Sequence, residues 1–164
     1  MRWHSCHPLP EVEIRYSAMA EKFLINGPVT REIISSKLDH LTERKELGGH
    51  SVFLGQVRAD VKGHRRVKAI EYSAYEEMVR KEAEAIQKEI LSEFNDVRRV
   101  VILHSTGRVM AGEVSLLVVV SGGHRQQAMT ACSRVVDLVK EKLPVWKKEI
   151  YEDDTHEWVQ NNLA

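Results

Sequence analysis

Hydrophobic and polar positions along the chain follow two periods, which predict three helices and five strands in the order α-β-β-α-β-β-α-β. Apolar residues recur every three or four positions over residues 30–47, 76–94 and 124–143, as they do on one face of a helix. Runs rich in β-branched residues cover 50–58, 67–75, 97–104, 113–121 and 145–151. Several adjacent strands without a helix between them favour an α+β fold with mixed or antiparallel pairing.

Glycine and proline mark where several elements are expected to end. Turns at Gly107 and Gly112 separate the two central strand runs, and Pro144 ends the third helix because it cannot continue one. Residues 1–18 contain two prolines and no sustained period. We therefore expect a disordered N-terminal extension whose removal leaves stability and activity almost unchanged, and a single domain over residues 19–164.

Length, charge and cysteine content exclude several classes of protein. The chain has 164 residues, which suits one domain, and its 24 Lys and Arg balance 24 Asp and Glu. This balance argues against a dedicated DNA-binding domain, whose basic excess supplies most of its affinity. Two cysteines, Cys6 and Cys132, are too few for a disulfide framework, and no CxxC pair indicates a structural zinc. Because no apolar run approaches the ~20 residues of a membrane helix and no signal-peptide pattern occurs, we expect a cytoplasmic location.

None of the common catalytic motifs occurs in the chain. It has no GxxxxGK[ST] phosphate loop, no GxGxxG, no HExxH and no Gly-x-Ser-x-Gly elbow. Cys132 falls on the apolar stripe of its predicted helix, so we expect an unreactive core residue. The chain therefore offers no nucleophile of its own.

Two groups of basic residues stand at places where anions commonly bind. The segment FLGQVR ends at Arg58 and leads into a basic loop, for which a solvated surface loop is the plain alternative. The segment GGHRQQA places His124 and Arg125 at a helix start, where unpaired N–H groups and the helix dipole attract anions. An ordinary glycine-rich turn is the alternative there.

A third basic group surrounds the segment LPVW. Lys140 lies about 100° from its neighbour Val139 on a helical wheel, at the edge of the apolar stripe, so it can line a cleft. Lys147 follows Pro144 in a strand whose alternation puts Lys148 on the opposite face. Solvated surface charge is again the alternative. Together, the three groups predict a concave anion site formed by Arg58, His124, Arg125, Lys140 and Lys147.

Five segments occur in the order and spacing of one known family. They are FLGQVR, IEYSAYEEM, ILHSTGRVMAGE, SGGHRQQAM and DLVKEKLPVWKKE. Through them the chain resembles, over residues 23–158, the large catalytic subunit of molybdopterin synthase. The most specific part is the His-Arg pair followed by the pattern K-x-x-x-P-[VI]-W-K-[KR]-E, which begins at Lys140.

The resemblance implies a fold, an activity and partners. The fold is α+β, an α/β hammerhead-type domain with an additional antiparallel β-sheet. The activity is that of a sulfurtransferase, which inserts two dithiolene sulfurs into cyclic pyranopterin monophosphate to form molybdopterin. The sulfur arrives as a thiocarboxylate on the Gly-Gly C-terminus of a small ubiquitin-like sulfur-carrier subunit. The large subunit forms a homodimer flanked by two small ones. We expect no cofactor, no metal, and no nucleic-acid or membrane partner.

The resemblance also implies roles for single residues. Lys140 matches the family's essential lysine beside the thiocarboxylate, and Lys147 matches its second catalytic lysine. Arg58, His124 and Arg125 match residues that hold the pterin phosphate. Phe53 matches an aromatic position near that pocket. A partly buried lysine among other cations is expected to have a lowered pKa, which suits proton transfer near neutrality.

The chain departs from the family pattern at two places, and two other functions stay open. Ser105 stands where many relatives carry Arg, which removes a cation from the pocket rim or from a surface pair. Gly122-Gly123 replaces Ser-Ala, which loosens the helix start. One alternative function is a non-catalytic anion- or tail-binding module that kept the fold. The other is a small RNA-binding domain that uses the basic loop, for which nucleic-acid binding would be salt-sensitive.

Overall fold

A computed structural model describes residues 21–159 of the chain. The predicted N-terminal extension, residues 1–18, lies outside the described residues, as do residues 160–164. Within residues 21–159, no helix is long and apolar enough to cross a membrane.

Eight strands, three α-helices and one short 3-10 helix make up the described part of the chain. The strands are β1 (Leu24–Asn26), β2 (Gly49–Gln56), β3 (Val61–Lys62), β4 (Arg65–Ala74), β5 (Val97–Met110), β6 (Val114–Gly122), β7 (Val145–Tyr151) and β8 (His156–Val159). The helices are α1 (Arg31–Asp39), the 3-10 helix η1 (His40–Glu43), α2 (Glu76–Glu93) and α3 (Arg125–Lys142). The three predicted helices and five predicted strands are all present, while β1, β3 and β8 were not predicted.

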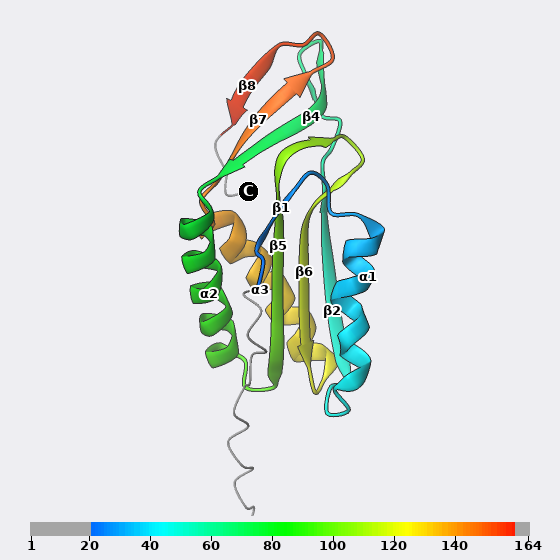
Figure 1. The fold of residues 1–164 in the computed structure, drawn as a ribbon, viewed down its shortest axis with the longest axis vertical. Helices are drawn as coiled ribbons and strands as arrows, with labels where there is room; N and C mark the ends of the chain where they lie inside the picture. Colours follow the sequence, from blue (N-terminus) through cyan, green and yellow to red (C-terminus); the bar gives the residue numbers. More distant parts are fainter. Residues whose placement is uncertain (1–20, 160–164) are drawn as a thin grey trace, which may run out of the picture.

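The strands follow one path in the order β2-β6-β5-β4-β7-β8. Neighbours on this path pair antiparallel, whereas the short β1 runs parallel to β5. Figure 1 shows a large sheet of β2, β6 and β5 flanked by helices, and a smaller sheet of β4, β7 and β8 at one end of an elongated molecule. The α+β fold with an additional antiparallel sheet is thereby confirmed.

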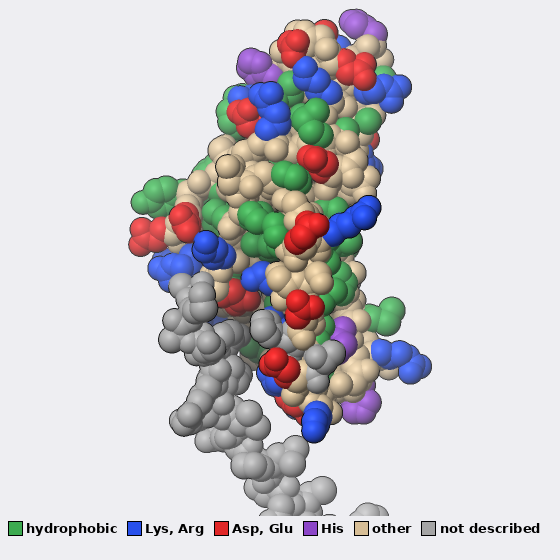
Figure 2. Space-filling model, turned by 45° about the vertical axis from the view of Figure 1, so that its right-hand side comes forward, with side chains coloured by type: hydrophobic (Ala, Val, Ile, Leu, Met, Phe, Trp, Pro, Cys, Tyr) green, Lys and Arg blue, Asp and Glu red, His purple; other side chains and the backbone are tan. Residues whose placement is uncertain are grey.

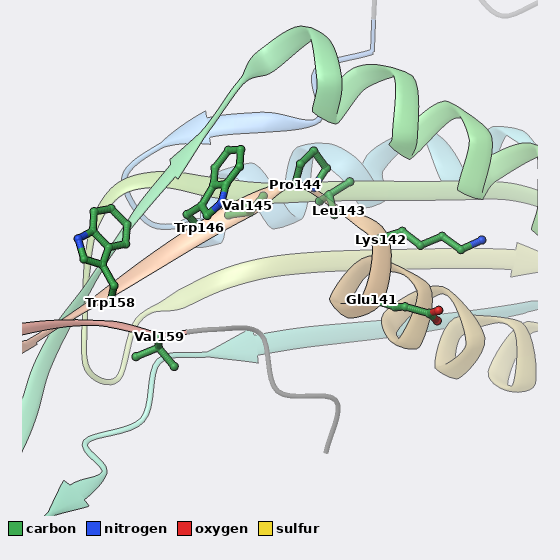
Figure 3. Close-up of a pocket in the computed structure, with 8 residues that line it drawn as sticks. All are labelled: Glu141, Lys142, Leu143, Pro144, Val145, Trp146, Trp158 and Val159. Carbon is green, nitrogen blue, oxygen red and sulfur yellow. The ribbon is translucent and has the colours of Figure 1, made fainter.

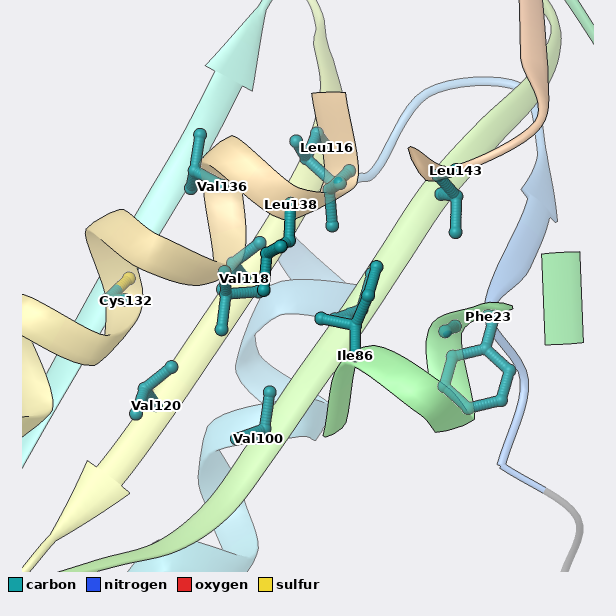
Figure 4. Close-up of a cluster of buried hydrophobic side chains, with 14 of the residues drawn as sticks. Phe23, Ile86, Val100, Leu116, Val118, Val120, Cys132, Val136, Leu138 and Leu143 are labelled. Carbon is teal, nitrogen blue, oxygen red and sulfur yellow. The ribbon is translucent and has the colours of Figure 1, made fainter. Parts of the chain in front are cut away.

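Alternate residues of β5 and β6 pack into two separate core layers. Val118 and Val120 of β6 point toward α2 and α3, where they meet Ile86 and Cys132 (Figure 4). Val119, between them in the sequence, belongs to the layer under α1. Because both faces of the sheet are covered, β6 reads as a continuous apolar run instead of an alternating one. Cys132 is buried and burial raises the pKa of its thiol, which confirms the expected core residue.

The structure corrects one predicted boundary, because β5 continues through Gly107 instead of ending in a turn there. Gly107 has a φ of +72°, and a Cβ at this position would lie 2.5 Å from Asn26 Oδ1. Glycine therefore lets the strand bend past β1. Before the bend β5 pairs with β6, and after it with β4. The bent strand thus joins the large sheet to the smaller one, and the predicted turn at Gly112 follows its end.

Candidate active site

A cavity of about 770 Å³ lies where the large sheet meets the smaller one. Its walls come from β2 and the segment after it, from β4, β5 and β6, from the last turn of α3 and its exit, and from β7. Four of the six predicted site residues line this cavity: Phe53, Arg58, Lys140 and Lys147. Residues from three separate segments of the sequence therefore share one space.

The two lysines reach the cavity from consecutive elements. Lys140 is exposed at the end of α3, next to Val139, which also lines the cavity. Two residues beyond α3, Pro144 prevents the helix from continuing, and β7 begins at once. Strand alternation then turns Lys147 toward the cavity and Lys148 away from it, as predicted.

Lys147 is partly buried, and its side chain has a lowered pKa. Burial holds its pKa below the usual value, and the positive charges of Lys140 and Lys62 act in the same direction. The carboxylate of Glu149 opposes them. The expected lowering of a lysine pKa is thus confirmed for Lys147. A larger fraction of its amine is neutral near pH 7–8 than for a free lysine, so it is better suited to exchange a proton.

Six polar or titratable residues of the cavity wall are absent from the predicted site, and three of them pack together. Tyr72, His104 and Ser115 line the cavity, each from a different strand. The Tyr72 hydroxyl donates to Ser115 Oγ at 3.1 Å, and Ser115 Oγ donates to the Gly55 carbonyl at 3.4 Å. The rings of Tyr72 and His104 meet edge to face, with centroids 5.0 Å apart. Strand alternation could have placed Tyr72 on one face of its strand, but nothing in the sequence pairs it with His104.

His124 and Arg125 do not reach this cavity within one chain. They follow β6, whose first residue, Val114, lies near the cavity end of the sheet and whose last residue, Gly122, lies at the other end. At about 3.3 Å per residue, β6 separates the two ends by roughly 26 Å. The predicted anion site is therefore divided between the two ends of the large sheet.

The helix start at His124 already holds a carboxylate of the same chain. Asp96 Oδ2 accepts hydrogen bonds from the His124 backbone N–H at 2.7 Å and contacts its ring Nδ1 at 3.1 Å. Burial raises the pKa of Asp96, but the His124 hydrogen bonds and the Arg98 charge outweigh it and hold that pKa below its usual value. A Cβ on Gly123 would lie 2.6 Å from Asp96 Oδ1. The glycine therefore admits the carboxylate, which caps the helix start, while the expectation of a loosened start stays a prediction.

The basic loop is paired with acids. Lys62 contacts Glu149 at 2.7 Å, Arg65 contacts Glu157 at 3.5 Å, and Lys68 pairs with Asp154. Figure 2 shows basic and acidic side chains close together at the tip of the molecule. Arg58, whose side chain is 80% exposed, pairs with Asp60 at 2.9 Å. These pairs neutralise the loop and argue against the RNA-binding alternative.

The side chain of Ser105, the other departure from the family pattern, does not line the cavity. Ser105 is fully buried and is not part of the cavity lining. Its hydroxyl is the one sealed polar side-chain atom without a hydrogen-bond partner among the described residues. Ser105 therefore takes no cation from the cavity rim of this chain.

A second hollow, of about 600 Å³, lies between the end of α3 and the pair β7–β8 (Figure 3). Trp146 and Trp158 line it together with Lys142, but none of the six predicted site residues does. Lys142 Nζ bonds Glu89 at 3.0 Å, and Lys148 Nζ contacts Glu71 at 2.6 Å. Both lysines are thus engaged outside the candidate site and provide matched controls for Lys140 and Lys147.

The residues described by the structure offer no group of three or more His, Cys, Asp or Glu side chains placed to hold a metal ion.

Comparisons with known proteins identify a family. A family model described as MoaE protein matches residues 29–142. A molybdopterin synthase catalytic subunit of Dictyostelium discoideum is 42% identical over 116 residues, which cover 70% of this chain and 73% of that protein. Another, from Drosophila willistoni, is 39% identical over 136 residues, which cover 79% of this chain but only 36% of that protein. The chain thus spans about a third of the length of the second relative.

Two solved structures share the fold. Molybdopterin synthase from Staphylococcus aureus superposes with a TM-score of 0.75 at 30% identity, over 86% of this chain and 98% of that one. A complex of subunits 1 and 2 of molybdopterin-converting factor from Helicobacter pylori 26695 contains a chain with a TM-score of 0.72 at 22% identity, over 87% of this chain and 91% of that one. At the latter identity the likeness speaks for the fold alone.

Proposed function

The chain belongs to the MoaE family of molybdopterin synthase catalytic subunits, and on this premise we propose that it is a cytoplasmic sulfurtransferase acting on cyclic pyranopterin monophosphate. Its sulfur source is the C-terminal thiocarboxylate of a small ubiquitin-like subunit. Each transfer forms a carbon–sulfur bond on the pterin side chain in place of a carbon–oxygen bond, whose oxygen leaves with the phosphate as the cyclic ester opens or departs as water. Water then cleaves the acyl–sulfur bond, so the partner's C-terminus leaves as a carboxylate. Two transfers supply the dithiolene of molybdopterin.

The observation that carries this proposal is the shared cavity of Lys140, Lys147 and Arg58. A phosphate ester and a thiocarboxylate are both anions, and bringing them together requires fixed positive charge. The described residues show no cysteine at the cavity, since Cys132 lies in the core. An imported sulfur nucleophile makes such a cysteine unnecessary.

The two lysines suit different parts of this reaction. Lys140, exposed at the mouth, can meet a thiocarboxylate that arrives from outside. It would stabilise the developing oxyanion or transfer a proton. Lys147, deeper and with a lowered pKa, would hold the substrate and assist opening of the cyclic phosphate. Phe53, partly buried in the same wall, offers an aromatic surface for the pterin ring.

A small-subunit partner is supported by the assembly of a relative with the same fold. The Helicobacter pylori structure is a complex of subunits 1 and 2 of its converting factor. We propose that this chain likewise binds a small subunit, whose C-terminal Gly-Gly tail enters the cavity beside Lys140. Glycines suit such a tail because only a narrow backbone has to pass between the walls.

A homodimer would reunite the divided anion site. β2 is an edge strand of the described sheet, pairing only with β6, and it exposes 43% of Val52 and 44% of Leu54. Unpaired edges with exposed apolar residues favour pairing with another strand. Two copies paired antiparallel through the middle of β2 would set Gly49 of one opposite Gln56 of the other.

This pairing brings the missing cations to the cavity. Gly49 lies directly against the helix start, because a Cβ on it would be 2.8 Å from Arg125 Cα. Gln56 lines the cavity two residues before Arg58. The partner subunit's His124 and the partner subunit's Arg125 would therefore stand beside the cavity of the first chain, where they can hold the pterin phosphate.

Subunit mixing tests the shared site. Lys140→Ala and His124→Ala chains, each inactive alone, are unfolded, mixed and refolded together. A site built from two chains regains about a quarter of wild-type activity, because half of the dimers are mixed and each has one intact site. A site built within one chain regains none.

One assay tests the proposed function itself. The purified chain is given the thiocarboxylated small subunit and cyclic pyranopterin monophosphate, and molybdopterin is measured. We expect product in proportion to thiocarboxylate consumed. Binding of the partner without product would instead support the non-catalytic tail-binding alternative.

A further inference from the structure

His104 is a neutral hydrogen-bond acceptor in a cavity that also presents three cationic side chains, Arg58, Lys140 and Lys147. Its Nδ1 lies 2.8 Å from the backbone carbonyl of Ser105. A carbonyl can only accept, so Nδ1 must carry the proton and Nε2 must carry a lone pair. The imidazole is thus held in one tautomer by the main chain of its own strand.

The Nε2 atom of His104 has no bonding partner among the described residues and is not fully buried. His104 lines the cavity, and no described residue bonds its Nε2. Among the fully buried polar side-chain atoms of residues 21–159, only Ser105 Oγ lacks a hydrogen-bond partner. Because Nε2 also lacks a partner but is not that atom, it must be partly accessible to solvent. Tyr72 packs its ring edge to face against the imidazole and limits its rotation.

Most other side-chain acceptors in the cavity wall already have a partner within the chain. Asp60 pairs with Arg58, Glu149 pairs with Lys62 and accepts from Tyr151, and Ser115 Oγ accepts from Tyr72. Gln56 is exposed at the rim. The remaining side chains with charge, Arg58, Lys140 and Lys147, can only donate when protonated. Of the side chains that line the cavity away from its rim, His104 is therefore the one whose acceptor atom has no partner among the described residues.

We propose that His104 is a substrate-binding residue whose Nε2 accepts a hydrogen bond from a ring N–H of the pterin, while the cations hold the phosphate at the other end. This rests on the proposed function, and it extends it by naming the group that reads the ring. A pterin presents a ring N–H in the plane of its heterocycle. A phosphate ester with no hydrogen-bond donor at that position would leave Nε2 unpaired, so His104 would favour the pterin over such an ester.

The charge state of His104 follows from its surroundings. Burial lowers its pKa below the ordinary 6.5 and the Lys147 charge acts likewise, while the Ser105 hydrogen bond opposes them. The other titratable groups that line the cavity are Arg58, Asp60, Tyr72, Lys140, Lys147 and Glu149. His104 is therefore neutral at pH 7. It becomes a donor, unable to accept, as the pH falls through its lowered pKa.

The test measures binding of cyclic pyranopterin monophosphate by calorimetry, without the small subunit, alongside turnover with it. His104→Leu is expected to weaken binding and raise KM roughly 10- to 100-fold, with kcat changed much less. His104→Gln, whose Oε1 can accept, should recover most of the loss. His64→Gln, the same substitution in the exposed β3–β4 turn, should have no effect.

Two further measurements keep the proposal falsifiable if a variant fails to fold. Wild-type KM should rise below the pKa of His104, and His104→Gln should lose that rise. ¹⁵N NMR of the wild-type protein at pH 7.5 should show a protonated Nδ1 and an unprotonated Nε2. An Nε2–H tautomer, or binding that is equal in wild type and His104→Leu, would overturn the proposal. If the pterin binds through His104 but no molybdopterin forms, the proposed function fails and this inference stands.

Discussion

Asp96 binds the N-terminus of α3 through the backbone N–H of His124, at 2.7 Å. The helix start attracts anions, but within one chain the carboxylate of Asp96 already occupies it. A carboxylate in this position offsets the partial positive charge of the helix end. It also ties the loop after α2 to α3, since Asp96 follows α2 by three residues.

The contribution of Asp96 to stability should depend on pH. Its pKa is lower in the folded protein than its ordinary 3.8, so its stabilising effect is complete above pH 3.8. The effect is lost as pH falls through the folded pKa. Asp96→Ala should lower the melting temperature by a few degrees at pH 7, and the difference from wild type should shrink as the pH falls below 3.8. A difference that stays constant as the pH falls below 3.8 would contradict the ionic role.

Gly123→Ala should destabilise the protein although alanine favours helices. Its Cβ would lie 2.6 Å from Asp96 Oδ1 and would push the carboxylate away. In the Asp96→Ala background the same substitution should cost clearly less, because the atom it meets is gone. Thermal unfolding of the two single variants and the double variant measures this coupling. Additive effects would show that the contact does not matter.

The core between α2 and the sheet provides a reference for larger effects. Ile86 is completely buried and packs in the layer shown in Figure 4. Ile86→Ala should reduce the free energy of unfolding by about 2–5 kcal/mol, through lost burial and the cavity left behind. Urea unfolding followed by circular dichroism measures it. A loss below 1 kcal/mol would mean that the layer collapses around the gap.

Lys147 and Lys148 are neighbours on opposite faces of β7 and should differ in function. Lys147→Ala should reduce turnover roughly 10²-fold, since it removes one preorganised charge from the cavity. Lys148→Ala removes a pair with Glu71 outside the cavity and should leave turnover close to wild type. Equal losses in the two variants would show that general surface charge, not the cavity, is what matters.

Most helices and strands, and the four of six predicted site residues that line the cavity, could be predicted from the sequence for identifiable reasons. The helix around Ile86 and the alternation around Lys147 follow from local periodicity, which is encoded in neighbouring residues. The bend at Gly107 was missed because a turn and a bent strand both use glycine at positive φ. Only β1, which packs beside that bend, distinguishes them, and β1 is too short to have a pattern.

The contacts between site residues that could not be predicted depend on the pairing of strands far apart in the sequence. Tyr72 stands opposite Lys147 only because β4 pairs with β7 in one register, and it meets His104 only because β5 bends. The capture of the His124 backbone by Asp96 joins residues whose proximity no motif signals. The basic residues after Arg58 correctly predicted a basic loop. Nothing in the sequence indicated that Asp154 and Glu157 would pair with it.

The most direct test of the account compares Lys140→Ala with Lys142→Ala in the complete assay, with thiocarboxylated small subunit and cyclic pyranopterin monophosphate. Both lysines belong to the end of α3, but Lys140 lines the cavity and Lys142 is paired with Glu89 outside it. Lys140→Ala should lower the rate of molybdopterin formation by at least roughly 10²–10³-fold, while fold and small-subunit binding are retained. Lys142→Ala should stay close to wild type. Wild-type turnover in Lys140→Ala, or an equal loss in Lys142→Ala, would contradict the assignment of Lys140 as the residue that assists sulfur transfer.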